Sequence, residues 1–174
     1  AFGEAMPLAE QLGDARRIAG LLGSLGWNEM RLGDLDGAIQ HFSRALALYE
    51  RLRDRQYAIN TMSNLASVYI RRSEYAKALQ LLKDALQASQ SHQLDESEAF
   101  IQSNFVDLYL RMKQPSLANT ALAEAYQHCT DQDIPFLLPT VLRQKAEHAL
   151  AIGNPAAGVD LIERALTLAQ QGKD

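Results

Sequence analysis

The sequence has little of what most other classes of protein require. Its 174 residues include one Cys, five Pro, ten Gly and only 17 Val, Ile and Thr together. A single Cys excludes an intramolecular disulfide, and so few turn-forming and β-branched residues argue against a β fold or a disordered linker. No apolar run approaches the ~18 residues of a membrane span, and the first residues lack the basic start and apolar stretch of a signal peptide. We therefore expect a cytoplasmic chain in a reducing compartment.

Basic charge is also scarce. Lys and Arg number 17 against 21 Asp and Glu, for a net charge of −4, which counts against nucleic-acid binding because such binding needs a basic surface. Leu (27 residues) and Ala (26) dominate instead. Both lose little side-chain freedom in a helix, so we expect an all-α chain.

The sequence repeats itself every 40 residues without a gap. The equivalent positions include Ala38, Ala78, Ala118 and Gly158; Phe42, Leu82, Leu122 and Ile162; and Ala45, Ala85, Ala125 and Ala165. One step back, Phe42 corresponds to Phe2, so we expect residues 1–14 to be the second helix of a truncated repeat. The complete repeats are expected at 15–54, 55–94, 95–134 and 135–174.

Each repeat is predicted to consist of two helices. Apolar residues at 35, 38, 39, 42, 45, 46 and 49 follow the spacing of one helical stripe. Breaks at Gly33-Asp34, Ser73-Glu74, Gln114-Pro115 and Asn154-Pro155 divide the repeats, and they are short enough to require antiparallel helices. The expected helices are 1–11, 15–32, 35–51, 56–72, 75–90, 96–112, 115–128, 137–152 and 155–170. Because one pair cannot bury both stripes, the pairs are expected to stack as a single domain, an open superhelix.

The sets of equivalent positions in successive repeats, which we call columns, resemble the pattern of the tetratricopeptide repeat (TPR). The second complete repeat has the pattern as Met62, Leu65, Ala66, Tyr69, Ala78, Leu82 and Ala85. The resemblance implies a right-handed α-solenoid of antiparallel helix pairs that serves as an interaction scaffold, and the 40-residue period is similar to a long-helix subclass found in bacterial signalling proteins. Three positions depart from the pattern: Glu29 replaces an aromatic residue, Lys145 a large apolar residue and Gly158 an alanine.

The resemblance also implies that first helices line a concave wall on which a partner binds. Two columns qualify there, one containing Asn64 and Asn104 and the other Arg31, Arg71 and Arg111. Asn can pair with the backbone of a peptide and Arg with carboxylates, which favours a protein or peptide partner with acidic groups. Other wall candidates are Trp27, Asn60, Ser63, Ser67, Phe100, Ser103, Asp107 and Arg143. The alternative is structural: Arg facing the negative end of a helix dipole, and Asn fixing the stacking of neighbouring helices.

Catalytic and cofactor motifs are missing from the sequence. Gly20, Gly23 and Gly26 fall inside a helical stripe rather than in a phosphate loop. The nearest approach to a metal site is His128-Cys129 with Asp131 and Asp133, and a packed helix position is the simpler interpretation of Cys129. We expect neither an enzyme nor a cofactor.

Two functions follow from the sequence. The first is a scaffold that binds a peptide or helical segment of a partner, and the alternative is a sensory or regulatory segment of a larger bacterial signalling protein. We also expect an excerpt from a longer array whose ends expose apolar surface at Phe2, Met6 and the outer face around Leu161 and Leu168. Self-association through these ends is a further expectation.

Overall fold

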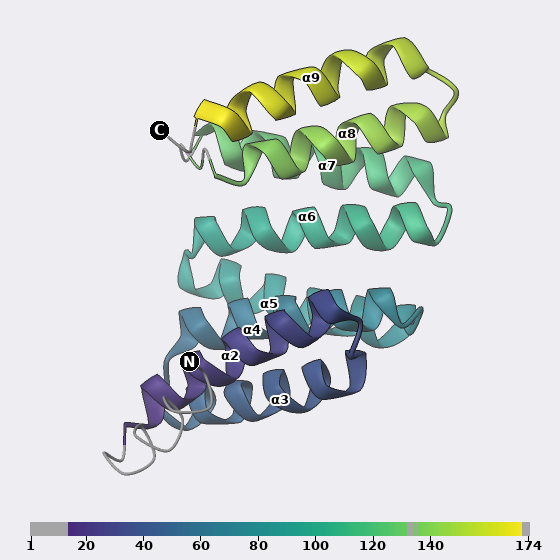
Figure 1. Cartoon of the computed structure of the whole chain (residues 1–174). Coiled ribbons are helices and arrows are strands. Elements are labelled where there is room, and N and C mark those ends of the chain that lie inside the picture. Colours follow the sequence, from purple (N-terminus) through teal and green to yellow (C-terminus); the bar gives the residue numbers. More distant parts are fainter. Residues whose placement is uncertain (1–13, 132–133, 135, 172–174) are drawn as a thin grey trace. The chain divides into compact units, whose positions relative to one another are not determined.

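The computed structural model describes residues 14–131, 134 and 136–171, which form eight α-helices and no strand (Figure 1). Their bounds are α2 Ala15–Leu32, α3 Leu35–Arg51, α4 Arg55–Arg71, α5 Tyr75–His92, α6 Asp95–Arg111, α7 Pro115–Asp131, α8 Leu138–Ala151 and α9 Pro155–Gln171. The all-α prediction is confirmed. The largest boundary difference is at the end of α7, expected at 128 and found at Asp131. The predicted helix 1–11 lies outside the described residues.

The chain divides into two compact units at Ala85 and Leu86, inside α5. The first unit contains α2, α3, α4 and the start of α5, and the second contains the end of α5 and α6 to α9. Within both units, helices joined by short turns pack against each other. The expectation of a single domain stays a prediction.

In the first unit, α3 packs against both α2 and α4. Phe42 of α3 is fully buried with Met30 of α2 and with Leu65 and Val68 of α4. Gly26 of α2 makes room for this ring, because a Cβ atom there would lie 3.0 Å from the Phe42 Cδ2 atom. The column of small residues therefore exists because the helices of a pair approach each other closely.

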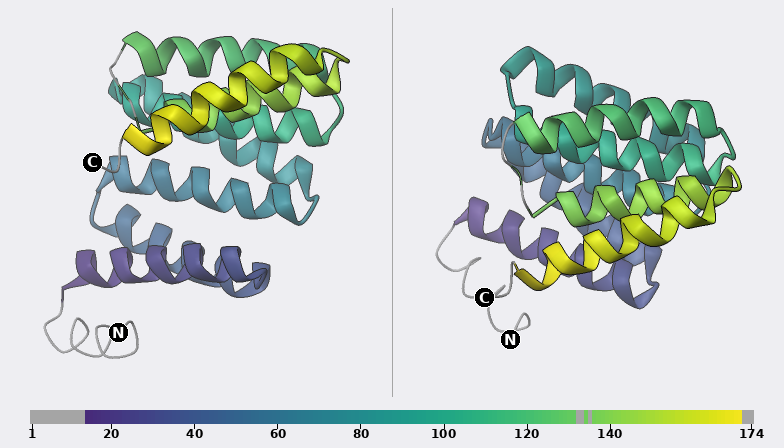
Figure 2. Two further views of the ribbon diagram at one scale, coloured as in Figure 1. Left: turned by 45° about the horizontal axis from the view of Figure 1, so that its top comes forward. Right: turned by 90° about the horizontal axis from the view of Figure 1, so that it is seen from above.

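In the second unit, α7 packs against α6 and α8, and α8 also packs against α6 and α9. Figure 2 shows α8 and α9 lying side by side. Small residues are again buried, at Ala118 of α7 and Ala146 of α8, and Leu122 of α7 is 3% exposed. Leu161 and Leu168 of α9, which were expected on the outer face, are half-buried. The same apolar pattern thus builds the core of both units.

The turns inside the four described pairs share one backbone geometry. The first residue after the helix, or the second, has a positive φ: 89° at Gly33, 63° at Ser73, 56° at Lys113 and 81° at Gly153. The N–H group of the next residue then donates to a carbonyl of the last helical turn, as from Asp34 to the Glu29 oxygen at 2.9 Å. This is the hydrogen bond of a Schellman cap. Two of the four positions carry side chains that adopt this conformation at a cost.

Replacing Lys113 by Gly is therefore expected to raise the free energy of unfolding by roughly 0.5–1 kcal/mol. The Lys113 side chain is exposed, so its removal takes little else away. The measurement is urea unfolding followed by circular dichroism. The reciprocal variant, Gly33→Ala, has open space around the new Cβ and should lose a similar amount. Equal stabilities in all three proteins would show that the positive φ carries no cost.

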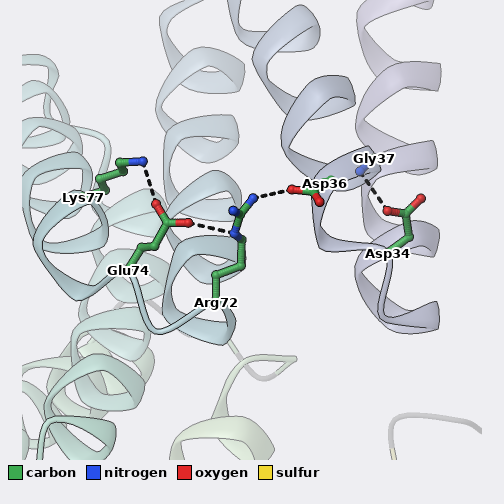
Figure 3. A network of polar contacts seen from close by, with 6 residues as sticks. All are labelled: Asp34, Asp36, Gly37, Arg72, Glu74 and Lys77. Carbon is green, nitrogen blue, oxygen red and sulfur yellow. Dashed lines mark hydrogen bonds and ion pairs between the residues drawn. The ribbon is translucent and has the colours of Figure 1, made fainter.

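A cluster of polar residues lies at the turn between α2 and α3 and the turn between α4 and α5. In Figure 3, Arg72 pairs with Asp36 of α3, and its Nε atom lies 2.7 Å from Oε1 of Glu74. The Lys77 ammonium donates to Glu74 Oε2 over 2.6 Å and, with Arg72, holds the pKa of that carboxyl below its usual value. Nearby, Asp34 caps α3 by accepting from the Gly37 N–H group. Exposed ion pairs of this kind contribute little stability. We interpret this cluster as structural because its members pair with one another.

Candidate functional site

The strongest candidate site lies in the second unit, on the first helices of its two pairs and the segment that precedes α8. We call it the α6–α8 surface and define it by Phe100, Ser103, Asp107, Phe136, Arg143 and Gln144. Phe100, Ser103 and Asp107 are three and seven residues apart on α6 and so share one face of that helix. The hydrogen bonds of Gln144 join α8 to this face.

An exposed aromatic pair forms one end of this surface. The ring centroids of Phe100 and Phe136 are 5.6 Å apart with the planes tilted by 36°. Phe100 is 36% exposed and Phe136 59% exposed. Two adjoining aromatic rings in contact with water form an apolar patch of the kind that anchors a partner's side chain.

The buried side-chain amide of Gln144 lies at the middle of the α6–α8 surface. The Gln144 side chain is 1% exposed, and its Nε2 atom donates to the Ser103 carbonyl oxygen and to Asp107 Oδ1, both at 2.8 Å. Its Oε1 atom accepts from the Ser103 hydroxyl at 3.0 Å. Gln144 occupies the position equivalent to Asn64 and Asn104, so at this repeat the amide column serves the stacking of α8 on α6. The structural alternative therefore holds for this member of the column.

The desolvated carboxyl group of Asp107 lies at the other end of the α6–α8 surface. Burial raises the pKa of Asp107, while the hydrogen bond from Gln144 and the positive charges of Arg143 and Arg111 act in the opposite direction. Arg143 also pairs with Glu147 on its own helix, and the negative charge of Glu147 raises the pKa of Asp107 further. The ionised Asp107 thus gains less from its partners than it loses by leaving water. Such a group would gain from a further positive charge.

The predicted site residues of the first unit are less well placed to bind a partner than those of the α6–α8 surface. Trp27 is 44% exposed and meets Phe42 edge-on, with centroids 6.4 Å apart. Asn64 is half-buried. The Ser67 hydroxyl donates to the Ser63 carbonyl oxygen at 3.2 Å. Asn60, in the same unit, and Asn104, on α6, already have partners within the protein.

The three arginines of the predicted column do not behave alike. The Arg71 Nη1 atom donates to the Met30 carbonyl oxygen at 3.1 Å, near the C-terminal end of α2. Arg71 therefore satisfies a carbonyl at the negative end of a helix, which is the structural alternative. Arg31 and Arg111 are exposed, and Arg111 acts electrostatically on Asp107. The structure thus groups Arg111 and Arg143 with Asp107 and assigns Arg71 to helix capping.

Sequence reasoning missed Phe136. Its equivalents in the 40-residue register are Arg16, Gln56 and Glu96, so the register indicates no apolar column at this position. The signal was an aromatic residue in a Pro-containing segment, TDQDIPFLLP at 130–139. The link that Gln144 makes between α8 and α6 is the stacking role that the sequence left open as the alternative for the amide column.

Other chemistry is weakly represented in the described part of the chain. Within the described ranges, no three His, Cys, Asp or Glu side chains gather closely enough to hold a metal ion. Cys129 is buried, and burial raises the pKa of its thiol, as fits a packed helix position. None of the described helices combines the length and the apolar character that crossing a membrane requires.

The comparisons with known proteins agree with this architecture. Residues 17–91 match the model of the family described as tetratricopeptide repeat. A comparison with curated proteins gave no match. Among solved structures, the chain is similar to BtubC (BKLC) from P. vanneervenii, with 21% identity and a TM-score of 0.75 over 98% of this chain and 70% of that chain. That likeness shows the fold, an α-helical repeat. Together, the family match, the helix pairs and the repeated columns show that the segment 17–91 belongs to the tetratricopeptide-repeat family.

Proposed function

We propose that the chain is an interaction module that binds a peptide segment of another protein on the α6–α8 surface. Tetratricopeptide repeats are generally modules for protein interaction, and all-helical repeats of this family are typically scaffolds rather than enzymes. The observation that carries the proposal is the pairing of Phe100 and Phe136, exposed to water on the same surface as the desolvated Asp107. An apolar anchor beside an under-compensated charge supports a binding function better than a structural one.

The proposed partner presents an apolar side chain to the aromatic pair and a basic side chain to Asp107. Phe100 and Asp107 are seven residues apart on α6, which is about 10 Å along the helix axis. An extended peptide covers that distance in about three residues. An acidic partner was expected from the arginine column, but Arg71 of that column bonds within the protein, and the separate candidate Arg143 is paired with Glu147. We therefore propose a basic segment in place of an acidic one.

The test is selection of binding peptides from a phage-displayed random library on the immobilised full chain. Selected sequences are expected to contain an aromatic or large aliphatic residue about three positions from Lys or Arg. Their affinity, measured by fluorescence anisotropy with synthetic peptides, should fall by about tenfold or more in Phe100→Ala/Phe136→Ser. Asp107→Asn, which keeps an oxygen for Gln144, should weaken basic peptides and leave their uncharged analogues unaffected.

The matched control is the pair Trp27→Ala and Asn64→Ala on the first unit, which should bind as the unaltered chain does. Circular dichroism checks that every variant is folded. If binding is instead lost in the Trp27 and Asn64 variants and kept in the phenylalanine variants, the site lies on the first unit and the proposal is wrong. Selected peptides without a basic residue would refute the assigned role of Asp107.

A further inference from the structure

The turn between α3 and α4, in the first unit, combines positive charge with exposed apolar groups. Three arginines occupy alternate positions of this segment, and all three are exposed. Leu52 is 43% exposed and Tyr57 51% exposed. Arg16, at the start of α2, joins them because its guanidinium carbon lies 5.7 Å from the centre of the Tyr57 ring. We call this the arginine surface and define it by Arg16, Arg51, Leu52, Arg53, Arg55 and Tyr57.

Contacts within the first unit hold the aromatic ring and one guanidinium of this surface in place. Tyr57 stacks on the buried Tyr49 of α3, with ring centroids 5.2 Å apart and the planes tilted by 21°. Arg16 pairs with Asp54, whose side chain is 9% exposed. Asp54 also accepts from the Tyr57 N–H group at the start of α4. These groups are therefore ordered before a partner arrives, which lowers the entropic cost of binding.

The three arginines of the turn are not neutralised within the part of the chain that the structure describes. None of them makes an ion pair there. The nearby acidic groups Asp54 and Asp14 are paired with Arg16 and Arg17. This leaves Glu50 alone against three arginines, an excess of two positive charges. The N-terminal end of α4 adds partial positive charge of its own.

The fold does not require arginine at these positions. One repeat later, the residues equivalent to the three arginines are Ser91, Gln93 and Asp95. That turn has the same geometry, with a φ of 55° at Gln93 against 56° at Arg53. It also has the same hydrogen bond, from Leu94 to the Ser89 carbonyl oxygen at 3.1 Å, where Asp54 donates to Tyr49 at 2.9 Å. The structure of the turn therefore does not account for the positive charge.

We propose that the arginine surface binds an acidic segment of a second protein, in which carboxylates flank a large apolar side chain. A guanidinium offers two parallel N–H donors that match a carboxylate. Leu52 and Tyr57 supply the apolar contact between these charges. The segment 50–57 contains no Lys. Because Arg and Tyr are enriched in protein interfaces and Lys is depleted there, this composition favours a protein over a nucleic acid or a membrane.

The probe is a synthetic fluorescein-labelled peptide in which runs of Glu flank a central Phe. Titrated with the full chain and followed by fluorescence anisotropy, it is expected to bind with a dissociation constant on the order of 100 μM at low salt. Added salt should weaken binding because it screens exposed charges. A peptide with Gln in place of every Glu should not bind. Arg51→Gln/Arg53→Gln/Arg55→Gln should weaken binding by about tenfold or more.

The matched control is Arg31→Gln/Lys83→Gln/Lys113→Gln, which removes the same charge from exposed positions outside the surface. It should bind the acidic peptide within about twofold of the unaltered chain. Leu52→Ser should weaken the Phe-containing peptide and leave a peptide with Ala in place of Phe unaffected. Circular dichroism checks that every variant is folded.

The arginine surface and the α6–α8 surface are tested separately, because they attract opposite charges and lie in different units. Phe100→Ala/Phe136→Ser should bind the acidic peptide normally. The arginine variant should likewise keep its affinity for basic peptides. A dissociation constant on the order of 100 μM is too weak for enrichment from a displayed library, so acidic peptides do not interfere with the selection on the α6–α8 surface.

Equal losses in the two triple variants would show a general effect of charge and would overturn the proposal, as would no binding at millimolar protein. A single-stranded oligonucleotide of the same charge is the competing probe. If it binds more tightly than the peptide and loses its affinity in the arginine variant, the surface binds nucleic acid and the assigned occupant is wrong.

Discussion

Replacing Phe42 by Ala is expected to lower the free energy of unfolding of the first unit by about 3–5 kcal/mol. The ring is fully buried among residues of α2, α3 and α4, so its removal leaves a cavity that joins all three helices. Trp27, the only tryptophan in the sequence, lies edge-on against this ring. Its fluorescence during urea unfolding therefore reports the stability of the first unit directly.

The matched control for this experiment is Ile162→Ala, at the same register position of α9. Ile162 is 40% exposed, so the loss should stay below about 1 kcal/mol. Its unfolding is followed by circular dichroism, since Trp27 lies in the other unit. Similar losses at the two positions would mean that the register does not decide burial in this chain.

Gln144→Glu is expected to lower the free energy of unfolding at pH 7 by about 3 kcal/mol or more. The substitution preserves shape but places a carboxylate, 1% exposed, against the Ser103 carbonyl oxygen and Asp107, both of which now accept from the Gln144 amide. Burial and the neighbouring negative charge raise the pKa of the new carboxyl in the folded state above its unfolded value. The loss should therefore shrink as the pH falls towards about 4, where the group is protonated in both states.

Urea unfolding between pH 7 and pH 4, compared with the unaltered chain, measures this dependence. Gln127→Glu, an exposed position on α7, adds the same charge and should change stability by less than about 0.5 kcal/mol. A loss at Gln144→Glu that does not depend on pH would indicate a packing defect and would contradict the electrostatic explanation.

Helices and turns were predictable because each is determined by local sequence. The apolar stripe from Leu35 to Tyr49 and the break at Gly33-Asp34 place α3 at the bounds that the structure shows. The end of α7 was placed too early because His128-Cys129 precedes polar residues that resemble a turn, whereas Thr130 stays helical by bonding to the Tyr126 carbonyl oxygen.

The departures from the repeat pattern were visible in the sequence, but their compensation was not. Glu29, in place of an aromatic residue, lies 2.6 Å from the His41 ring nitrogen across the helix pair. Lys145, in place of a large apolar residue, lies over the Tyr126 ring. Each partner is more than ten residues away, so only the packed structure identifies it. The same reason explains why the contact between Phe100 and Phe136 could not be found from spacing.

The contacts of the candidate site residues could not be predicted from the sequence, because a column defines a face of a helix and not the hydrogen bonds made on that face. Arg71 and Gln144 lie on first helices as expected, yet both are used to join neighbouring helices. Whether a polar side chain bonds within the protein depends on its length and on the next helix. Those distances are set by tertiary packing, which a single sequence does not report.

The positive-φ turns have a consequence for how such a chain can change in length. Gly33, Ser73, Lys113 and Gly153 close their helices with the same backbone hydrogen bond, and Arg53 and Gln93 adopt the same conformation between pairs. A duplication or deletion of one whole 40-residue module would thus rejoin the backbone through a turn that already exists. Insertions of any other size would require a new connection, so growth by complete modules is the least costly route for this architecture.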